Sequence, residues 1–276
     1  PRSMDYISTK EAAQKWGISE RRVRSLCSEG KIEGAARCGD WVWSIPAGTQ
    51  NPADGRTLRY MRNRSLRTGN QDYREADKLR SSSNLSTLTT DKKVEIVLEA
   101  LIYDNTDIKL EQVLSIFQLE NQQGISLEKQ ILALNMRSAL SSIPFDLNEK
   151  VLLDLHRRLM MSIDERSAGN YKLSGNQSQE TAAMFEQYSG SWSVLHPVAR
   201  AAFLFAEILR IQPFDKGTAE IAFVLLANEM YKAKLPPATF GANQIPELKA
   251  ALASTAIRGN SSPLVAMILD AVTANN

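Results

Sequence analysis

The chain has 276 residues, of which 43% are hydrophobic, so it is long enough for one large domain or two smaller ones with real cores. Its apolar runs stay well short of the ~20 residues that span a bilayer, and its first residues lack the layout of a secretion signal, which predicts a cytoplasmic protein that does not enter a membrane. Residues 1–80 carry sixteen Lys and Arg against ten Asp and Glu, although the formal charge of the whole chain is only +2. This asymmetry indicates a nucleic acid partner, whereas the two cysteines exclude a disulfide scaffold.

The first fifty residues predict two helices followed by a pair of strands. Ser8 and Glu11 have the spacing of a capping box at the start of a helix, and Ser19 is placed to cap a second helix. Residues Ile32–Ala36 and Trp41–Ile45 have the composition of two short strands joined by a turn. The pattern is typical of a helix-turn-helix with a wing, and it bounds a first domain at residues 4–50.

Residues 51–90 predict a basic linker. Between Arg56 and Gln71 there are five arginines and no acids. One weak helical face is formed by Leu58, Met61 and Leu66. The segment either lies along DNA or is a solvated connector, and both alternatives stay open.

From about residue 91 to residue 276 the pattern is helical. The apolar residues between Val94 and Ile102 recur at the spacing of a helix packed against a core, and Asp146 with Glu149 predicts the start of another helix. Only Tyr171–Gln177 has the turn residues of a β-hairpin. The fold class is therefore mainly α.

The segment from Tyr6 to Arg56 resembles the excisionase and MerR-like winged helix-turn-helix group. The resemblance is carried by the runs Tyr6-Ile-Ser-Thr-Lys-Glu-Ala-Ala and Trp16-Gly-Ile-Ser-Glu-Arg-Arg-Val. It implies that the second helix enters the major groove of DNA while the wing touches the backbone. The implied DNA-binding residues are Arg21, Arg22, Arg24, Ser25, Lys31 and Arg37. The alternative is a protein-docking module whose arginines are only solvated.

The segment from about 147 to 237 resembles the core of the Fic family, whose members transfer AMP or related groups from nucleotides to protein hydroxyls. The family pattern is His-Pro-Phe-x-(Asp or Glu)-Gly-Asn-Gly-Arg-x-x-Arg. The resemblance implies a Fic-type α-helical bundle with a small β-hairpin flap that includes Tyr171 and Lys172. The residues at the pattern's positions are Gln212, Pro213, Phe214, Lys216, Gly217, Thr218, Ala219, Glu220 and Phe223, of which Pro213, Phe214 and Gly217 match it.

The mismatches remove the chemistry that the resemblance implies. Gln212 replaces the general-base histidine, which typically contributes ~10²- to 10⁴-fold to the rate. Lys216 replaces the metal-binding acid, and Glu220 and Phe223 replace the two arginines that hold the nucleotide phosphates. We therefore expect a pseudoenzyme with no catalytic residues.

The same mismatches predict no cofactor and no metal site, because Lys216 cannot ligate magnesium. Backbone N–H groups of Gly217–Ala219 at a helix N-terminus, together with Lys216, allow weak binding of a small anion or nucleotide, and a vestigial pocket is the alternative. The two histidines, His156 and His196, lie elsewhere in the pattern, so we interpret both as structural.

Two further features follow from the same resemblance. Glu120 and Asn121 resemble the end of the family's inhibitory-helix pattern, (Ser or Thr)-x-x-x-Glu-(Gly or Asn), but Ile116 holds the Ser or Thr position, so Glu120 is interpreted as a relic or a surface acid. The flap of this family pairs with a target strand, which predicts a protein partner at Tyr171 and Lys172. The alternative is a hairpin whose backbone groups are hydrogen-bonded to one another and are not free to pair with a target strand.

The leading hypothesis is a non-catalytic regulator that binds DNA through its N-terminal domain. Its rivals are an active transferase that uses Asp215, Lys216 or a residue outside the motif, and a protein-interaction adaptor. Arginines that share one basic face favour DNA binding. Arginines that pair with Glu20 or Glu29 favour the adaptor.

Overall fold

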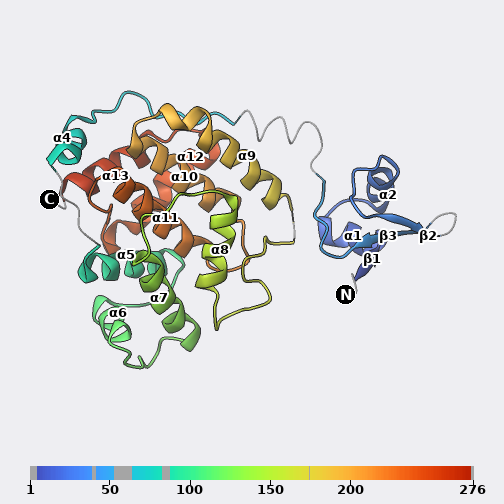
Figure 1. Ribbon diagram of the computed structural model, residues 1–276, viewed down its shortest axis with the longest axis horizontal. Coiled ribbons are helices and arrows are strands. Elements are labelled where there is room, and N and C mark those ends of the chain that lie inside the picture. Colours follow the sequence, from blue (N-terminus) through green and yellow to red (C-terminus); the bar gives the residue numbers. More distant parts are fainter. Residues whose placement is uncertain (1–4, 39–41, 53–63, 83–87, 174, 275–276) are drawn as a thin grey trace.

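Figure 1 shows the computed structural model, in which two short helices and a small sheet precede a large helical body. The structure describes residues 5–38, 42–52, 64–82, 88–173 and 175–274. Within these ranges, no helix combines the length and the apolar character needed to cross a membrane. The mainly helical fold confirms the predicted fold class.

The N-terminal helices begin at the predicted caps. Ser8 Oγ accepts a hydrogen bond from the Glu11 N–H, and the Glu11 carboxylate accepts one from the Ser8 N–H, so the capping box is formed. Ser19 Oγ accepts from the Arg22 N–H at 3.3 Å at the start of the next helix. The elements of this region are β1 (Tyr6–Ser8), α1 (Thr9–Trp16), α2 (Glu20–Ser28), β2 (Ala36–Cys38) and β3 (Val42–Pro46). They enclose a core of their own, which includes Ala12, Trp16, Val23, Leu26, Ile32 and Ile45.

The sheet differs from the predicted pair of strands. It has three antiparallel strands in the order β1-β3-β2, and β1 was not predicted because it is only three residues long and its last residue, Ser8, is the cap of α1. The strand predicted over Ile32–Ala36 was wrong in its bounds, since β2 begins only at Ala36. Ile32 is instead buried in the core beneath the helices, and Gly34 turns the chain with φ 75°.

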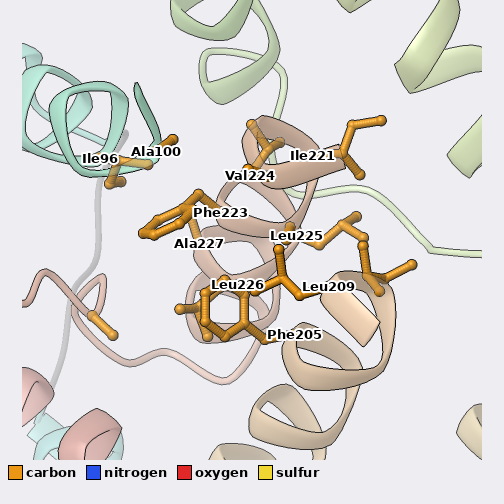
Figure 2. Close-up of a cluster of buried hydrophobic side chains, with 14 of the residues drawn as sticks. Ile96, Ala100, Phe205, Leu209, Ile221, Phe223, Val224, Leu225, Leu226 and Ala227 are labelled. Carbon is orange, nitrogen blue, oxygen red and sulfur yellow. The ribbon is translucent and has the colours of Figure 1, made fainter. Parts of the chain in front are cut away.

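The helical body is built around α10 and α11, which are buried on nearly all sides. Phe205 of α10 meets Phe223 of α11 edge to face with ring centroids 5.2 Å apart, and Ile96 and Ala100 of α5 lie beside them (Figure 2). The helices of the body are α4 (Arg74–Ser82), α5 (Thr90–Tyr103), α6 (Leu110–Phe117), α7 (Leu127–Leu140), α8 (Glu149–Leu159), α9 (Gln177–Ser189), α10 (Pro197–Ile211), α11 (Thr218–Lys232), α12 (Ile245–Arg258) and α13 (Ser262–Ala274).

Two local predictions in this body were wrong. The start of α8 is capped by Asn148, whose side chain accepts from the Val151 N–H, so Asp146 is not the cap. The described residues of Tyr171–Gln177 form no strand, and the hairpin of this chain is β2 with β3. The predicted structural role of His196 is confirmed, because its Nδ1 caps α10 by accepting from the Val198 N–H at 3.2 Å.

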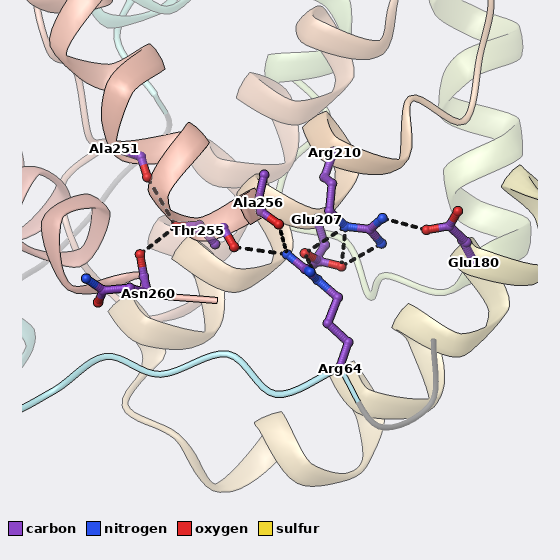
Figure 3. Close-up of polar contacts among 8 residues, drawn as sticks. All are labelled: Arg64, Glu180, Glu207, Arg210, Ala251, Thr255, Ala256 and Asn260. Atoms are coloured by element: carbon purple, nitrogen blue, oxygen red, sulfur yellow. Dashed lines mark hydrogen bonds and ion pairs between the residues drawn. The ribbon is translucent and has the colours of Figure 1, made fainter. Parts of the chain in front are cut away.

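Part of the segment expected to be a linker packs against the helical body. The Arg64 guanidinium donates to Glu207 Oε1 at 2.8 Å and to the carbonyl oxygens of Thr255 and Ala256 at 2.9 and 3.0 Å (Figure 3). Only 8% of the Arg64 side chain and 5% of the Glu207 side chain are exposed. Because a buried charge is costly unless it is paired and hydrogen-bonded, this contact fixes Arg64 on α10 and α12. We call it the Arg64 anchor.

After the anchor, the chain runs beside the residues that join α12 to α13. The Arg67 N–H donates to the Gly259 carbonyl, and the Arg67 carbonyl accepts from the Ser261 N–H, both at 2.8 Å. A side chain at Gly259 would place its Cβ 2.7 Å from the Ser65 carbonyl oxygen, so this close approach requires glycine. Helix α4 follows, although the sequence pattern gave no prediction of it.

Replacement of Arg64 tests the anchor. Arg64→Ala is expected to lower the free energy of unfolding by about 3 kcal/mol, because it leaves the buried Glu207 carboxylate with only Arg210 as a partner. Arg74→Ala is the matched control, since the Arg74 side chain is 84% exposed in its ion pair with Asp72 and its loss should cost much less than that of Arg64. Urea denaturation measures both values. Equal losses for the two variants would contradict the anchor.

Candidate functional site

The candidate site is the loop between α10 and α11, which carries the motif residues. Gln212 ends α10 in the left-handed conformation with φ 51°, and its Nε2 donates back to the Leu209 carbonyl oxygen at 2.7 Å. Gly217 has φ 78°, and a Cβ there would lie 2.6 Å from Met160 Cε. The left-handed conformation favours glycine at this position, and a larger residue would also require the end of the Met160 side chain to move.

His156 of α8 fixes the position of this loop through a hydrogen bond and a stacking contact. Its Nδ1 accepts from the Gly169 N–H at 2.9 Å, so its Nε2 carries the proton and donates to the Lys216 carbonyl oxygen at 3.1 Å. The imidazole stacks on Phe214 with ring centroids 3.8 Å apart. Burial lowers the pKa of His156 to about 4. Since both nitrogens are hydrogen-bonded and the ring is fully buried, His156 is a structural residue and does not serve as a base.

A pocket of about 280 Å³ opens beside the loop, between the loop and residues at the end of α5, on α7 and just after α8. Both of the lysines that line it are held by carboxylates. Lys216 Nζ lies 3.0 and 3.1 Å from the two Glu128 oxygens, and Lys129 Nζ lies 2.5 Å from Asp104 Oδ2. The exposed carboxylate of Asp215 also lines the pocket. The pocket therefore has no excess of positive charge among its described residues.

Glu220, in the first turn of α11, is turned into the protein. Its side chain is 1% exposed, and its Oε1 lies 3.5 Å from Lys129 Nζ without a hydrogen bond. Burial raises the pKa of the Glu220 carboxyl to about 7, although Lys129 opposes the rise. Lys129 is thus the nearest cation to this acid, and it is shared with Asp104.

The other motif residues of α11 belong to the core. Thr218, Ala219 and Phe223 are all buried, and Thr218 Oγ1 donates to the Phe214 carbonyl oxygen at 3.3 Å. The Phe223 ring packs edge to face against Tyr103 as well as Phe205. No described side chain at these positions extends a cation into the pocket.

The predicted flap segment is joined to the motif loop. The Lys172 N–H donates to the Pro213 carbonyl oxygen at 2.9 Å, and the Lys172 carbonyl accepts from Gln50 Nε2 at 3.0 Å. Tyr171 donates its hydroxyl to Glu149 Oε1 at 2.8 Å. Both backbone polar groups of Lys172 are therefore already hydrogen-bonded within the chain.

Glu120 and Asn121 lie apart from the motif. Helix α6 ends at Phe117, and both residues follow it in an exposed, non-helical stretch. Phe223, which stands at the position of the expected arginine partner, is 2% exposed in the core. The structure does not bring Glu120 and Phe223 together through any described contact.

The cations predicted to bind DNA lie on the surface of the N-terminal region, and several of them contact acids. Glu29 lies 4.0 Å from Arg22 and 2.7 Å from Lys31, and its Oε1 accepts from Ser25 Oγ at 2.5 Å. Glu20 lies 2.7 Å from Arg24. Arg21 and Arg37 are exposed, and for Arg21 the described part of the chain offers no ion-pair partner.

Sequence reasoning missed the acids and the lysine that face the motif loop. Glu128 and Lys129 stand in the first turn of α7, and Asp104 follows α5. Ser126 signals the start of a helix there, and it does accept from the Lys129 N–H. No local pattern, however, indicates that this helix start faces a loop almost ninety residues further along the chain.

Replacement of Glu220 tests its buried state through the pH dependence of stability. A carboxyl whose pKa in the folded state is about 7, above the ordinary 4.5, stabilises the fold below the lower value and loses that contribution as the pH rises through 7. Because glutamine stays neutral, the melting temperature of Glu220→Gln relative to the wild type is expected to rise from about pH 5 to about pH 8. Glu128→Gln, at a 44% exposed side chain, is the control and should show no such trend. A constant difference for Glu220→Gln would refute the raised pKa.

Comparison with known proteins agrees with this geometry. Residues 146–230 match the model of the Fic/DOC family. No curated protein matches the sequence of the chain.

Solved structures show a similar fold. A fragment of Fic-1 from C. elegans has a TM-score of 0.64 and 19% identity, with 73% of this chain and 68% of that chain covered. A Fic family protein from Desulfovibrio desulfuricans G20 has a TM-score of 0.61 and 16% identity, covering 73% of this chain and 70% of that one. A Fic domain containing signaling protein from Bacteroides thetaiotaomicron VPI-5482 has a TM-score of 0.53 and 16% identity, covering 80% and 91%. The chain therefore contains a Fic/DOC domain over residues 146–230, set in a mainly helical fold of the kind found in Fic proteins.

Proposed function

We propose that this chain is a non-catalytic Fic-domain protein that acts by binding a macromolecule through its N-terminal region. The observation that carries the first part is the charge balance of the motif pocket. Its two lysines are held by Glu128 and Asp104, and the acid Glu220 stands where the family has an arginine. A nucleotide triphosphate would bring several negative charges to a pocket whose cations are already neutralised.

The position of the general base supports the same proposal. A target hydroxyl must lose its proton as it attacks a phosphate, and the amide of Gln212 has no useful basicity near pH 7. That amide also donates to the Leu209 carbonyl at the end of α10. His156, whose imidazole stacks on Phe214 of the motif loop, uses both nitrogens within the protein.

The motif loop does not fit magnesium. Lys216 stands at the position of the family's metal-binding acid, and its ammonium is hydrogen-bonded to Glu128. A hard divalent cation needs oxygen ligands, and an ammonium at this place repels it. Any ligand that remains is a small anion, which would have to compete with Glu128 for Lys216 and would bind weakly and without a metal.

A transferase assay tests this proposal. Incubation with labelled ATP, GTP, UTP or CTP is expected to label neither the chain nor proteins of a lysate, and Gln212→His is expected to stay inactive because the phosphate-binding arginines are still missing. An active Fic protein in the same assay is the positive control. Robust transfer by the wild type that is lost in Asp215→Ala or Gln212→Ala would establish the rival enzyme.

DNA is the partner that we propose for the N-terminal region. Its candidate residues lie on α2 and around the wing, where exposed cations can reach phosphates or base edges. Exposed ion pairs contribute only about 0–1 kcal/mol, so phosphates can replace Glu20 and Glu29 as partners of these cations. Arg21 is exposed and is the residue from which we expect the first phosphate contact.

Protein docking is the second candidate, and the ion pairs favour it. Arg22, Arg24 and Lys31 all contact Glu20 or Glu29, which mixes the two signs of charge over the surface of α2. A surface of mixed charge suits a protein partner better than a uniformly negative polymer. The flap is a poorer docking edge, because both backbone groups of Lys172 are hydrogen-bonded.

The salt dependence of DNA retention distinguishes the two candidates. If Arg21 neutralises one phosphate, Arg21→Ala should lessen the slope of log K against log salt by about 0.9. Arg157→Ala on α8, which removes an exposed arginine from the helical body, is the control and should leave the slope unchanged. A failure of genomic DNA fragments to bind micromolar protein at ~50 mM salt would favour protein docking.

A further inference from the structure

A second pocket lies away from the motif loop. It has a volume of about 510 Å³ and is formed by α5, the start of α6, residues 239–244, α12 and α13. Its walls are largely apolar and include Leu98, Leu110, Phe240, Met267 and Ala271. A pocket of this size with apolar walls can enclose a small organic group.

One wall of this pocket contains a buried acid, Glu99 of α5. The residue is 2% exposed, and its Oε1 accepts hydrogen bonds from the N–H groups of Phe240 and Gly241, both at 2.8 Å. Its Oε2 is buried and has no hydrogen-bond partner among the described residues. A carboxylate oxygen that is shielded from water and unpaired is costly, so a donor at Oε2 would stabilise the site.

The rim of the pocket adds negative charge. Glu247 of α12 and Asp270 of α13 are exposed, and neither has an ion-pair partner in the part of the chain that the structure describes. Glu95, one turn before Glu99, lies 2.7 Å from Lys92, which is the nearby cation on the same helix. The rim and the wall together therefore attract a cation.

The kind of cation follows from the arrangement of these groups. Within the described residues there is no cluster of three or more acidic, His or Cys side chains placed to hold a metal ion. An apolar cavity with a single deep carboxylate instead matches an organic cation, whose methylene groups contact the walls while its N–H groups donate to the acid. Such a ligand places its charged group at Glu99 and its apolar groups against the apolar walls.

We propose that this pocket binds an alkylammonium or alkylguanidinium group, with its apolar stem against Leu98, Phe240 and Met267 and its N–H groups donating to Glu99 Oε2. The site is independent of the motif loop and of the N-terminal region, so its test does not depend on the function proposed above. The same chemistry is offered by a free amine or guanidine and by a lysine or arginine side chain.

Calorimetric titration of the full chain with n-butylguanidinium tests the proposal. The wild type is expected to bind this cation and not to bind n-butylurea, which has a similar shape but no charge. Glu99→Gln keeps a carbonyl oxygen for the Phe240 and Gly241 N–H groups but loses the charge, so the affinity should fall about tenfold or more. Glu120→Gln, which removes an exposed acid elsewhere, is the matched control and should bind like the wild type.

A second variant guards against a folding defect in Glu99→Gln. Asp270→Asn lies at the exposed rim, so it should fold normally and weaken binding about two- to threefold by reducing the attraction. Binding of n-butylguanidinium that is unchanged in both variants, or no binding by the wild type, would overturn the proposal. Binding of n-butylurea as tight as that of the cation would do the same.

The pH dependence gives a readout that a purely structural acid would not show. Burial raises the pKa of Glu99 to about 7, while Glu95 adds to the rise and Lys92 opposes it; Glu247 and Asp270 face the pocket from the other helices. A cation binds the ionised form, so the affinity should rise from about pH 6 to about pH 8 and binding should release protons. An affinity that is constant over this range contradicts the assignment of Glu99.

A blocked peptide with one central arginine separates the two sources of the ligand. If the free guanidinium binds and the peptide does not, the pocket takes a small molecule. If both bind and both are weakened by Glu99→Gln, the pocket takes the side chain of a protein. Either result supports the site, whereas a peptide that binds equally to wild type and Glu99→Gln would count against it.

Discussion

The motif loop depends on one buried imidazole. His156 accepts a hydrogen bond from Gly169, donates one to the carbonyl of Lys216 and stacks on Phe214. One side chain of α8 therefore contacts both the motif loop and the residues that lead into the flap segment. Because its pKa is about 4, it stays neutral throughout the physiological range and its donor and acceptor roles do not change. The hydrogen bond to the loop involves its backbone, and the stacking involves Phe214, which matches the family pattern. The loop can therefore keep its path when the residues that would carry chemistry, such as Gln212 and Lys216, are different.

The charges around the loop show how the fold accommodates those differences. Glu220 is nearly inaccessible to solvent at the position of a family arginine, and Lys129 from α7 lies close enough to balance part of its charge. Phe223, at the position where the family pattern has its second arginine, adds an aromatic ring to the packing between α10 and α11. An unpaired buried charge costs several kcal/mol, so a buried acid on one helix needs a cation on the helix that faces it. A pocket arranged in this way balances its charges within the protein, which is why we propose that it binds phosphates poorly.

Several helix starts follow closely from local patterns, whereas the motif loop was located by its resemblance to a family pattern. Ser8 with Glu11, and Pro197 after His196, determine where helices begin, because capping involves groups within one turn. The facing residues of the pocket could not be predicted in this way. Glu128 and Asp104 reach Lys216 and Lys129 only after α5 and α7 have packed, and the anchor of Arg64 on Glu207 joins positions far apart in the chain. A short pattern can also overpredict the length of a strand, as Ile32–Ala36 shows, because Ile32 is buried by the N-terminal core and not by strand pairing.

The Arg64 anchor also sets a length scale. The chain between Pro52 and Arg64 contains the eleven residues 53–63, and a fully extended segment of that size spans at most about 40 Å. Any macromolecule held by the N-terminal region is therefore confined to a small volume around α10 and α12. The hydrogen bonds of Gln50 with Lys172 and Ser178 tighten this limit, because they hold the end of the N-terminal region beside the flap segment. A ligand carried by the N-terminal region is therefore presented to the helical body from one direction.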